Sequence, residues 1–175
     1  MAKRFFGQVL EAVLPTHTAV ELGAGDGWTA SRLASNGAKV IAVDKKTKPE
    51  GLPSDVEWHE EGIDAWLAGL AKDFKADAFV LKNGIKFLEK PWVTETLLPE
   101  VVARTNSGGI VAIETYRQEP APSYRGIKSL FDVTELKAAF PGWEILREEE
   151  ATEHTTETAK TKRAFFLSRL IARKP

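Results

Sequence analysis

Short apolar runs alternate along the chain with segments in which apolar residues have helical spacing. In segment 5–13 the apolar side chains fall on one face of a helix, and Pro15 ends that pattern. The continuous apolar run 39–44 is typical of a parallel strand that is covered on both faces. The pattern predicts strands at 19–22, 39–44, 56–59, 77–81, 110–113, 143–147 and 164–172, and helices in a segment ending at Asn36 and at 63–70, 91–104 and 132–140.

This alternation predicts an α/β domain with a mainly parallel sheet. We expect the order β-α-β-α-β-α-β-α-β-α-β-β, in which the last two strands form a hairpin and place one antiparallel strand in the sheet. The polar loop of this hairpin is flanked by an acidic segment, 148–150, and a basic one, 160–163, which we expect to pair with each other. We expect one domain over 1–175, with an N-terminal helix in 1–17 and the core in 18–175.

Composition excludes several classes of site. The 175 residues are 43% hydrophobic and 28% charged, which is typical of a globular protein, and the net charge of −1 argues against a general attraction to nucleic acid or anionic membranes. The absence of cysteine excludes thiolate metal sites and thiol nucleophiles, and the three scattered histidines suggest no metal site. No segment has the pattern of a membrane span or a cleavable signal peptide, so we expect a cytoplasmic protein.

A glycine-rich loop, Glu-Leu-Gly-Ala-Gly-Asp-Gly at 21–27, lies between the first sheet strand and a helix. Glycines allow a tight turn and a close approach of the backbone to a ligand. The loop also falls at the carboxyl edge of its strand, where open α/β sheets bind ligands. A plain turn between strand and helix is the alternative, but it would need only one glycine. We therefore predict a ligand-binding loop.

Two cofactor classes suit such a loop. Dinucleotide sites use G-x-G-x-x-G, whereas here the spacing is G-x-G-x-G and Trp28 takes the place of the third glycine, where an indole would obstruct close packing. Glu21 suits a ligand with a positive end, such as S-adenosylmethionine, which has an ammonium and a sulfonium group and no phosphate. Asp44, 21 residues after Gly23, is placed to bind ribose hydroxyls or, alternatively, to cap the turn after its strand. Both cofactor classes carry ribose, so Asp44 alone does not separate them.

Segment 20–27 resembles the first motif of class I S-adenosylmethionine-dependent methyltransferases, and the resemblance extends over 18–174. Within that class the later chain is similar to small tellurite-resistance-type small-molecule methyltransferases, in segments 109–116, 134–136 and 170–175. The resemblance implies a Rossmann-like, doubly wound, mainly parallel seven-stranded sheet with one antiparallel strand from the C-terminal hairpin.

The resemblance also implies S-adenosylmethionine as cofactor. The glycine loop and Glu21 would hold its methionine part and Asp44 its ribose. Segment 63–65 falls at the adenine site, where Asp64 could equally serve as a helix N-cap. Lys82 and Asn83 would line the pocket beside the methyl group. The expected cofactor-binding residues are Glu21, Gly23, Ala24, Gly25, Gly27, Asp44, Ile63, Asp64, Ala65, Lys82 and Asn83.

A long segment, 116–128, follows the fifth predicted strand and contains two prolines. It is either a lid or pocket wall or an ordinary solvated connection. As a lid, its aromatic and basic groups would favour an aromatic or anionic substrate, with Tyr116 and Arg117 as the substrate contacts. Methyl transfer is a direct displacement that requires alignment and exclusion of water, so we assign no catalytic residue. His59, Glu60 and Glu61 are expected on the surface.

The leading hypothesis is a methyltransferase that acts on a small molecule. The alternatives are a methyltransferase acting on RNA or protein, and a non-catalytic ligand-binding protein with a methyltransferase fold; Trp28 disfavours a nicotinamide oxidoreductase. The fourth strand ends in Leu-Lys-Asn-Gly, which departs from the Asn-Pro-Pro-aromatic motif of amino-group methylation. A lysine–aspartate–lysine–glutamate tetrad of ribose methylation is not found either. The methyl acceptor, the use of a general base and the oligomeric state stay open.

Overall fold

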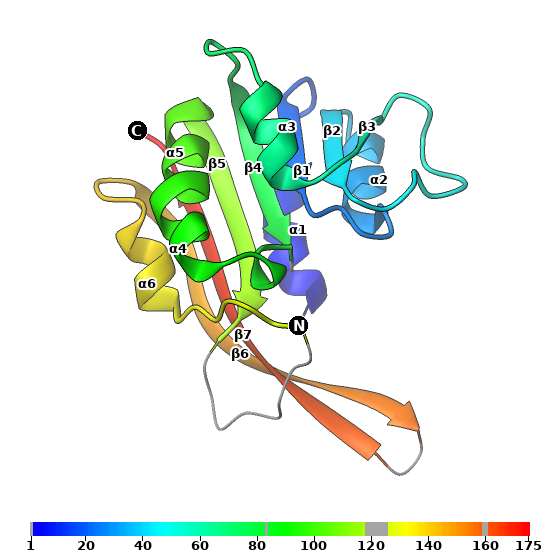
Figure 1. Ribbon diagram of the computed structural model, residues 1–175, viewed down its shortest axis with the longest axis vertical. Coiled ribbons are helices and arrows are strands. Elements are labelled where there is room, and N and C mark those ends of the chain that lie inside the picture. Colours follow the sequence, from blue (N-terminus) through cyan, green and yellow to red (C-terminus); the bar gives the residue numbers. More distant parts are fainter. Residues whose placement is uncertain (1, 83, 118–125, 159–160) are drawn as a thin grey trace.

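The computed structural model describes all residues except 1, 83, 118–125 and 159–160. For residues 2–4, 155–158 and 161–163 it describes the backbone but not the side chains. It contains a seven-stranded sheet with helices on both faces (Figure 1). The strands are β1 Thr18–Leu22, β2 Lys39–Asp44, β3 Glu57–Glu60, β4 Ala76–Lys82, β5 Thr105–Tyr116, β6 Glu144–Thr158 and β7 Thr161–Arg173. The helices are α1 Ala2–Ala12, α2 Trp28–Ser35, α3 Ile63–Gly69, η1 Ile85–Phe87, α4 Lys90–Trp92, η2 Val93–Leu97, α5 Leu98–Arg104 and α6 Val133–Ala138.

The strand order is β3-β2-β1-β4-β5-β7-β6. Strands β1 to β5 pair in parallel, and β7 runs antiparallel to both β5 and β6. The predicted α/β class, the doubly wound sheet and the single antiparallel strand are therefore confirmed. The order reverses between β1 and β4, and in open α/β sheets the crevice at such a point is where ligands bind.

Alternating side chains of the central strands build a core on each face of the sheet. On β4, Phe79 and Leu81 pack in one core with α3, α5 and α6, whereas Ala78 and Val80 pack in the other with α1 and α2. Both faces are covered, so successive residues of each central strand are buried, which explains the continuous apolar runs in the sequence. No helix in the described part of the chain is both long and apolar enough to cross a membrane.

The connection between β2 and β3 corrects the predicted element order, which placed a helix there. Residues 45–56 contain no helix. Pro49 and Pro53 remove backbone donors and disfavour helical geometry in the residues before them, and Gly51 has a positive φ of 80°. The predicted helix at 91–104 is present as one run through α4, η2 and α5, with Pro91 in its first turn, where a missing N–H is tolerated.

The C-terminal hairpin is longer than predicted, and Figure 1 shows β6 and β7 extending well beyond the other strands. The polar segment between residues 147 and 164, predicted to be a loop, is rich in threonine. The β-branched side chain of threonine favours strands even where hydrophobicity is low. The predicted pairing of 148–150 with 160–163 is wrong, because the register places 148–150 opposite 168–170. The three glutamates instead form ion pairs with Lys137, Arg147 and Arg117.

Candidate functional site: a cavity at the carboxyl edge of the sheet

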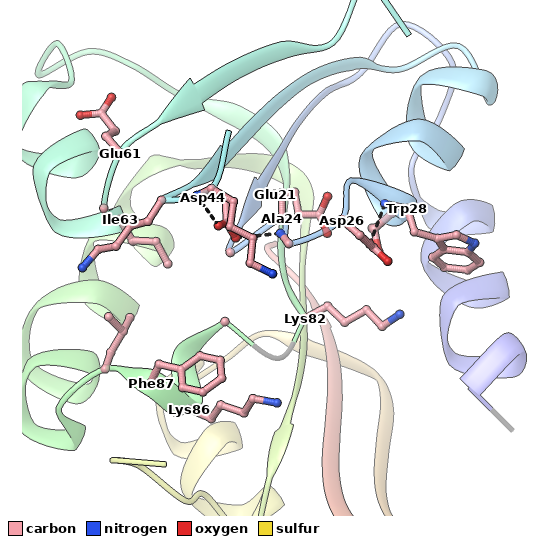
Figure 2. Close-up of a pocket in the computed structure, with 18 residues that line it drawn as sticks. Glu21, Ala24, Asp26, Trp28, Asp44, Glu61, Ile63, Lys82, Lys86 and Phe87 are labelled. Carbon is pink, nitrogen blue, oxygen red and sulfur yellow. Dashed lines mark hydrogen bonds between the residues drawn. The ribbon is translucent and has the colours of Figure 1, made fainter. Parts of the chain in front are cut away.

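A cavity of about 690 Å³ lies where the strand order reverses, beyond the carboxyl ends of β1, β2 and β4 (Figure 2). Its wall is formed by the glycine loop, the ends of β2 and β4, and the segments that lead into α3 and out of β4. The lining residues are Glu21, Gly23, Ala24, Gly25, Asp26, Trp28, Thr29, Asp44, Lys45, Lys46, Glu61, Gly62, Ile63, Lys82, Gly84, Lys86, Phe87 and Leu88.

The glycine loop closely contacts the segment after β4. A Cβ atom on Gly23 would lie 2.7 Å from the Cα of Gly84, so this crossing requires glycine. Gly25 has a φ of 61°, and a Cβ atom there would meet nothing within 4 Å. The backbone of Gly25 therefore faces open space in the cavity, as expected where a ligand approaches the main chain.

Asp44 links β2 to the glycine loop. Its Oδ2 atom accepts the Gly25 N–H at 2.7 Å, and its Oδ1 atom accepts the Lys46 N–H at 2.9 Å. The alternative role of capping the turn is therefore confirmed. It is compatible with ligand binding, because each carboxylate oxygen has a second lone pair and Asp44 lines the cavity.

Glu21 is the buried acid of the cavity wall, with 2% of its surface exposed. Burial raises the pKa of Glu21 to about 8, although hydrogen bonds from Thr29 and from the Ala30 backbone and the charge of Lys82 oppose the rise. Its Oε2 atom is buried without a hydrogen-bond partner in the described structure. A cationic group in the cavity would stabilise the carboxylate and satisfy this atom.

The end of the cavity beyond Glu21 is lined by lysines and aromatic rings. The Lys82 ammonium lies 4.7 Å from the centre of the Trp28 ring. The ring centres of Trp28 and of Phe6 in α1 are 4.8 Å apart. The Lys86 ammonium lies 5.1 Å from the Phe87 ring and 4.0 Å from the Tyr116 ring. This end of the cavity is therefore suited to an anionic or planar molecule.

Comparisons with known proteins bear on the fold. No family model matches the chain. It is 29% identical over 117 residues to the trans-aconitate 2-methyltransferase of Azoarcus sp. (strain BH72), a match that covers 62% of this chain and 42% of the length of that relative.

Among solved structures, TehB from Haemophilus influenzae has a TM-score of 0.78 at 21% identity, over 97% of this chain and 62% of TehB. The N-methyltransferase NodS from Bradyrhizobium japonicum WM9, solved in complex with S-adenosyl-l-homocysteine, has a TM-score of 0.70 at 14% identity, over 99% of this chain and 87% of NodS. The chain has the class I methyltransferase fold. The resemblance inferred from the sequence is thus confirmed at the level of the fold.

Most of the cofactor residues expected from the methyltransferase resemblance lie together at the cavity. Glu21, Gly23, Ala24, Gly25, Asp44, Ile63 and Lys82 line it. Gly27, Asp64 and Ala65 are not among the lining residues, and Asn83 lies outside the described residues. A Cβ atom on Gly27 would meet Leu52 at 2.8 Å, so this glycine allows packing against the β2–β3 connection.

The first three residues of helix α3 differ in their position relative to the cavity. Ile63 is buried at the cavity wall, whereas Asp64 and Ala65 are exposed. The helix N-cap is Gly62, without a side-chain cap, so the N-cap role considered for Asp64 is wrong. The role of Asp64 and Ala65 at an adenine site stays a prediction.

The two expected substrate residues lie beside the cavity without lining it. Tyr116 touches the cavity wall through Lys86, whereas the guanidinium of Arg117 pairs with Glu150 at 2.8 Å. Residues 118–125 of the long connection lie outside the described residues. After them, the N–H groups of Lys128 and Ser129 donate to the Lys86 carbonyl, so this end of the connection returns to the cavity wall.

Sequence reasoning missed several lining residues. Glu61 was expected on the surface, and the segment after β4, which provides Lys86 and Phe87, received no role. One signal was available: Gly84 comes two residues after the end of a buried strand, at the same edge as the glycine loop. A glycine there indicates a tight turn and a close approach of two backbones, as found with Gly23.

Proposed function

We propose that the chain is an S-adenosylmethionine-dependent methyltransferase that transfers a methyl group to a small-molecule acceptor. The observation that carries the proposal is the buried Glu21, whose unpartnered Oε2 atom lies at a cavity that Gly25 and Asp44 also line. A buried carboxylate at an open glycine loop suits a ligand whose reactive end is cationic and carries no phosphate.

The residues of the cavity fit S-adenosylmethionine in two parts. The glycine loop and Glu21 would bind its methionine part, and Asp44 would accept hydrogen bonds from its ribose hydroxyls. Ile63 offers an apolar contact for the adenine, with Asp64 and Ala65 following on the same helix. When bound, this cofactor supplies a methyl group activated on a sulfonium.

The chain's own contribution to methyl transfer would be positional. Glu21 neutralises positive charge at the loop, while Lys82 and the segment 84–88 border the space in which an acceptor would lie beside the cofactor. Alignment and exclusion of water are the main requirements of a direct displacement. Tyr116 and Arg117 would act from the edge of this space.

A small acceptor is supported by the size of the cavity, which lies within the range of roughly 300–1,000 Å³ of small-molecule sites. It is also supported by the names of two relatives, the trans-aconitate 2-methyltransferase and the 1,6-didemethyltoxoflavin-N1-methyltransferase of Burkholderia thailandensis. The latter was solved with bound 1,6-didemethyltoxoflavin and S-adenosylhomocysteine and has a TM-score of 0.71 at 16% identity. The near-neutral charge of the chain argues against a nucleic-acid acceptor.

Calorimetry tests the proposal directly. The protein is titrated with S-adenosylmethionine, S-adenosylhomocysteine, NAD and NADP, and we expect binding of the two adenosyl compounds alone. Comparable binding of NAD, or no binding of S-adenosylhomocysteine, would contradict the cofactor assignment. Formation of S-adenosylhomocysteine is then followed with trans-aconitate as the first acceptor tried, which separates a catalyst from a ligand-binding protein of the same fold.

A further inference from the structure

Lys82 and Lys86 place two ammonium groups at one end of the cavity. In the described part of the chain, no carboxylate lies within ion-pair distance of either ammonium. The neighbouring Lys90 and Lys128, in contrast, pair with Glu135 at 2.6 Å and Glu89 at 2.7 Å. Figure 2 shows both side chains extending to the same side of the cavity, away from Ile63.

The acids nearest to these lysines have other roles. Glu21 attracts Lys82, but in the free protein its pKa of about 8 leaves it mostly protonated at neutral pH. Glu114 attracts Lys86, but its carboxylate accepts the Nε–H of the buried Arg169 at 2.7 Å. The Asp26 carboxylate accepts the Trp28 N–H at 3.1 Å. Among the described residues, the lysine end of the cavity therefore holds two ammonium groups against the single charged carboxylate of Asp26, although the whole chain is nearly neutral.

Aromatic surface accompanies these charges. Phe87 is 54% exposed and lines the cavity next to Lys86, and Trp28 is 39% exposed beneath Lys82. Large apolar side chains at a cavity rim are typical of sites that bind the apolar part of a ligand. The same end of the cavity thus offers two cations and an apolar face.

We propose that Lys82 and Lys86 bind the carboxylate of the methyl acceptor, and that Phe87 contacts its planar apolar part. The acceptor is then an unsaturated or aromatic carboxylic acid. That the bound acid receives a methyl group rests on the proposed function, but the binding site for the carboxylate does not need the cofactor. The two ammonium groups supply charge-assisted hydrogen bonds, and an amide in place of the carboxylate would lose them.

The test compares cinnamate with cinnamamide, which has the same planar body without the charge. Both are titrated by calorimetry into the free protein and into protein saturated with S-adenosylhomocysteine. We expect cinnamate to bind about tenfold more tightly than cinnamamide. Lys82→Gln and Lys86→Gln should each weaken cinnamate by about fivefold or more and leave cinnamamide unchanged, since only the charged contact is lost. Phe87→Ala should weaken both compounds.

Lys39→Gln is the matched control, because Lys39 is an exposed lysine at the opposite end of β2 from the cavity. It should leave the affinity for both compounds unchanged. Equal binding of cinnamate and cinnamamide, or a Lys82→Gln/Lys86→Gln double variant with normal cinnamate affinity, would overturn the inference. Preference for cinnamate without any binding of S-adenosylhomocysteine would establish the anion site while contradicting the proposed function.

Discussion

The carboxylate of Asp44 accepts the Gly25 N–H at 2.7 Å, so the end of β2 holds the glycine loop that follows β1. Asp44 thereby has two connected tasks. It orders the backbone that faces the cavity, and it presents its remaining lone pairs to the same cavity. A substitution at Asp44 would remove a ligand contact and loosen the loop in one step.

Asp44→Ala should weaken binding of S-adenosylhomocysteine about tenfold or more, because each hydrogen bond to a charged group contributes roughly 1.5–3 kcal/mol. Calorimetry measures the loss. Asp44→Asn keeps one acceptor oxygen and should lose less. The control is Asp73→Ala, an exposed acid before β4, which should change nothing. Unchanged affinity in Asp44→Ala would show that this carboxylate does not contact the ligand.

Gly25→Val should abolish binding of S-adenosylhomocysteine. The φ of 61° strains any branched side chain, and the added atoms would occupy the open space in front of the loop. Gly142→Val is the matched control, because Gly142 has a φ of 77° with nothing within 4 Å and does not line the cavity. Both variants should lose similar stability in urea denaturation, and loss of binding in both would mean that strain, not occupancy, is responsible.

The sheet and the glycine loop could be predicted because their signals are local. Continuous apolar runs identify strands that are buried on both faces. The helix predicted from residue 132 is present as α6, with Asp132 as its N-cap and a capping box to Glu135. The glycine loop needed only its own spacing and its position after a strand. Asp44 could be placed because β2 pairs with β1 in parallel register, which brings their carboxyl ends together.

The parts that could not be predicted depend on tertiary geometry. Ile63 and Asp64 are adjacent in sequence, yet successive residues of a helix point in different directions, and only Ile63 lines the cavity. Lys86 and Phe87 reach the cavity because Gly84 crosses over Gly23, a contact between segments about sixty residues apart. Spacing within one segment carries no information on such a crossing.

Glu21 should make the stability of the free protein depend on pH. Its pKa rises from the ordinary 4.5 to about 8 on folding, so between these values the folded chain retains a proton that the unfolded chain has released. The contribution of Glu21 to stability is therefore present below about pH 4.5 and is lost progressively up to about pH 8. The free energy of unfolding of Glu21→Gln, measured in urea, should rise relative to that of the native chain over this window. A constant difference between the two proteins would contradict the raised pKa.

Binding of S-adenosylhomocysteine at pH 7 should release about one proton from Glu21. The ammonium of the ligand favours the carboxylate, so a group that is mostly protonated in the free protein ionises in the complex. Calorimetry in phosphate and in Tris, which differ in ionisation enthalpy, gives the number of protons released. Glu21→Gln should release close to none. Equal release by both proteins would assign the proton to another group.

Arg169 connects the three strands β5, β6 and β7. Its side chain is fully buried on β7 and donates to Glu114 of β5 at 2.7 Å and to Glu153 of β6. These hydrogen bonds and charges raise the pKa of Arg169 against the effect of burial. Glu114 is itself only 3% exposed. Arg169 and Glu114 therefore form a buried ion pair, and removing only one of the two side chains from such a pair greatly lowers the stability of the fold.

Arg169→Met should destabilise the protein by roughly 3–5 kcal/mol, because it removes the buried arginine that pairs with the Glu114 carboxylate, which is 3% exposed. The free energy of unfolding in urea measures the loss, and adding Glu114→Gln should recover part of it, since a buried amide costs less than a buried carboxylate that has lost its arginine. The control is Arg173→Met on the same strand. The side chain of Arg173 is 41% exposed, and its pair with Glu144, at 3.3 Å, should contribute about 1 kcal/mol or less. Equal losses in the two variants would show that burial of the pair is not the cause. Additive losses in the Arg169→Met/Glu114→Gln double variant would show that the two side chains are not coupled.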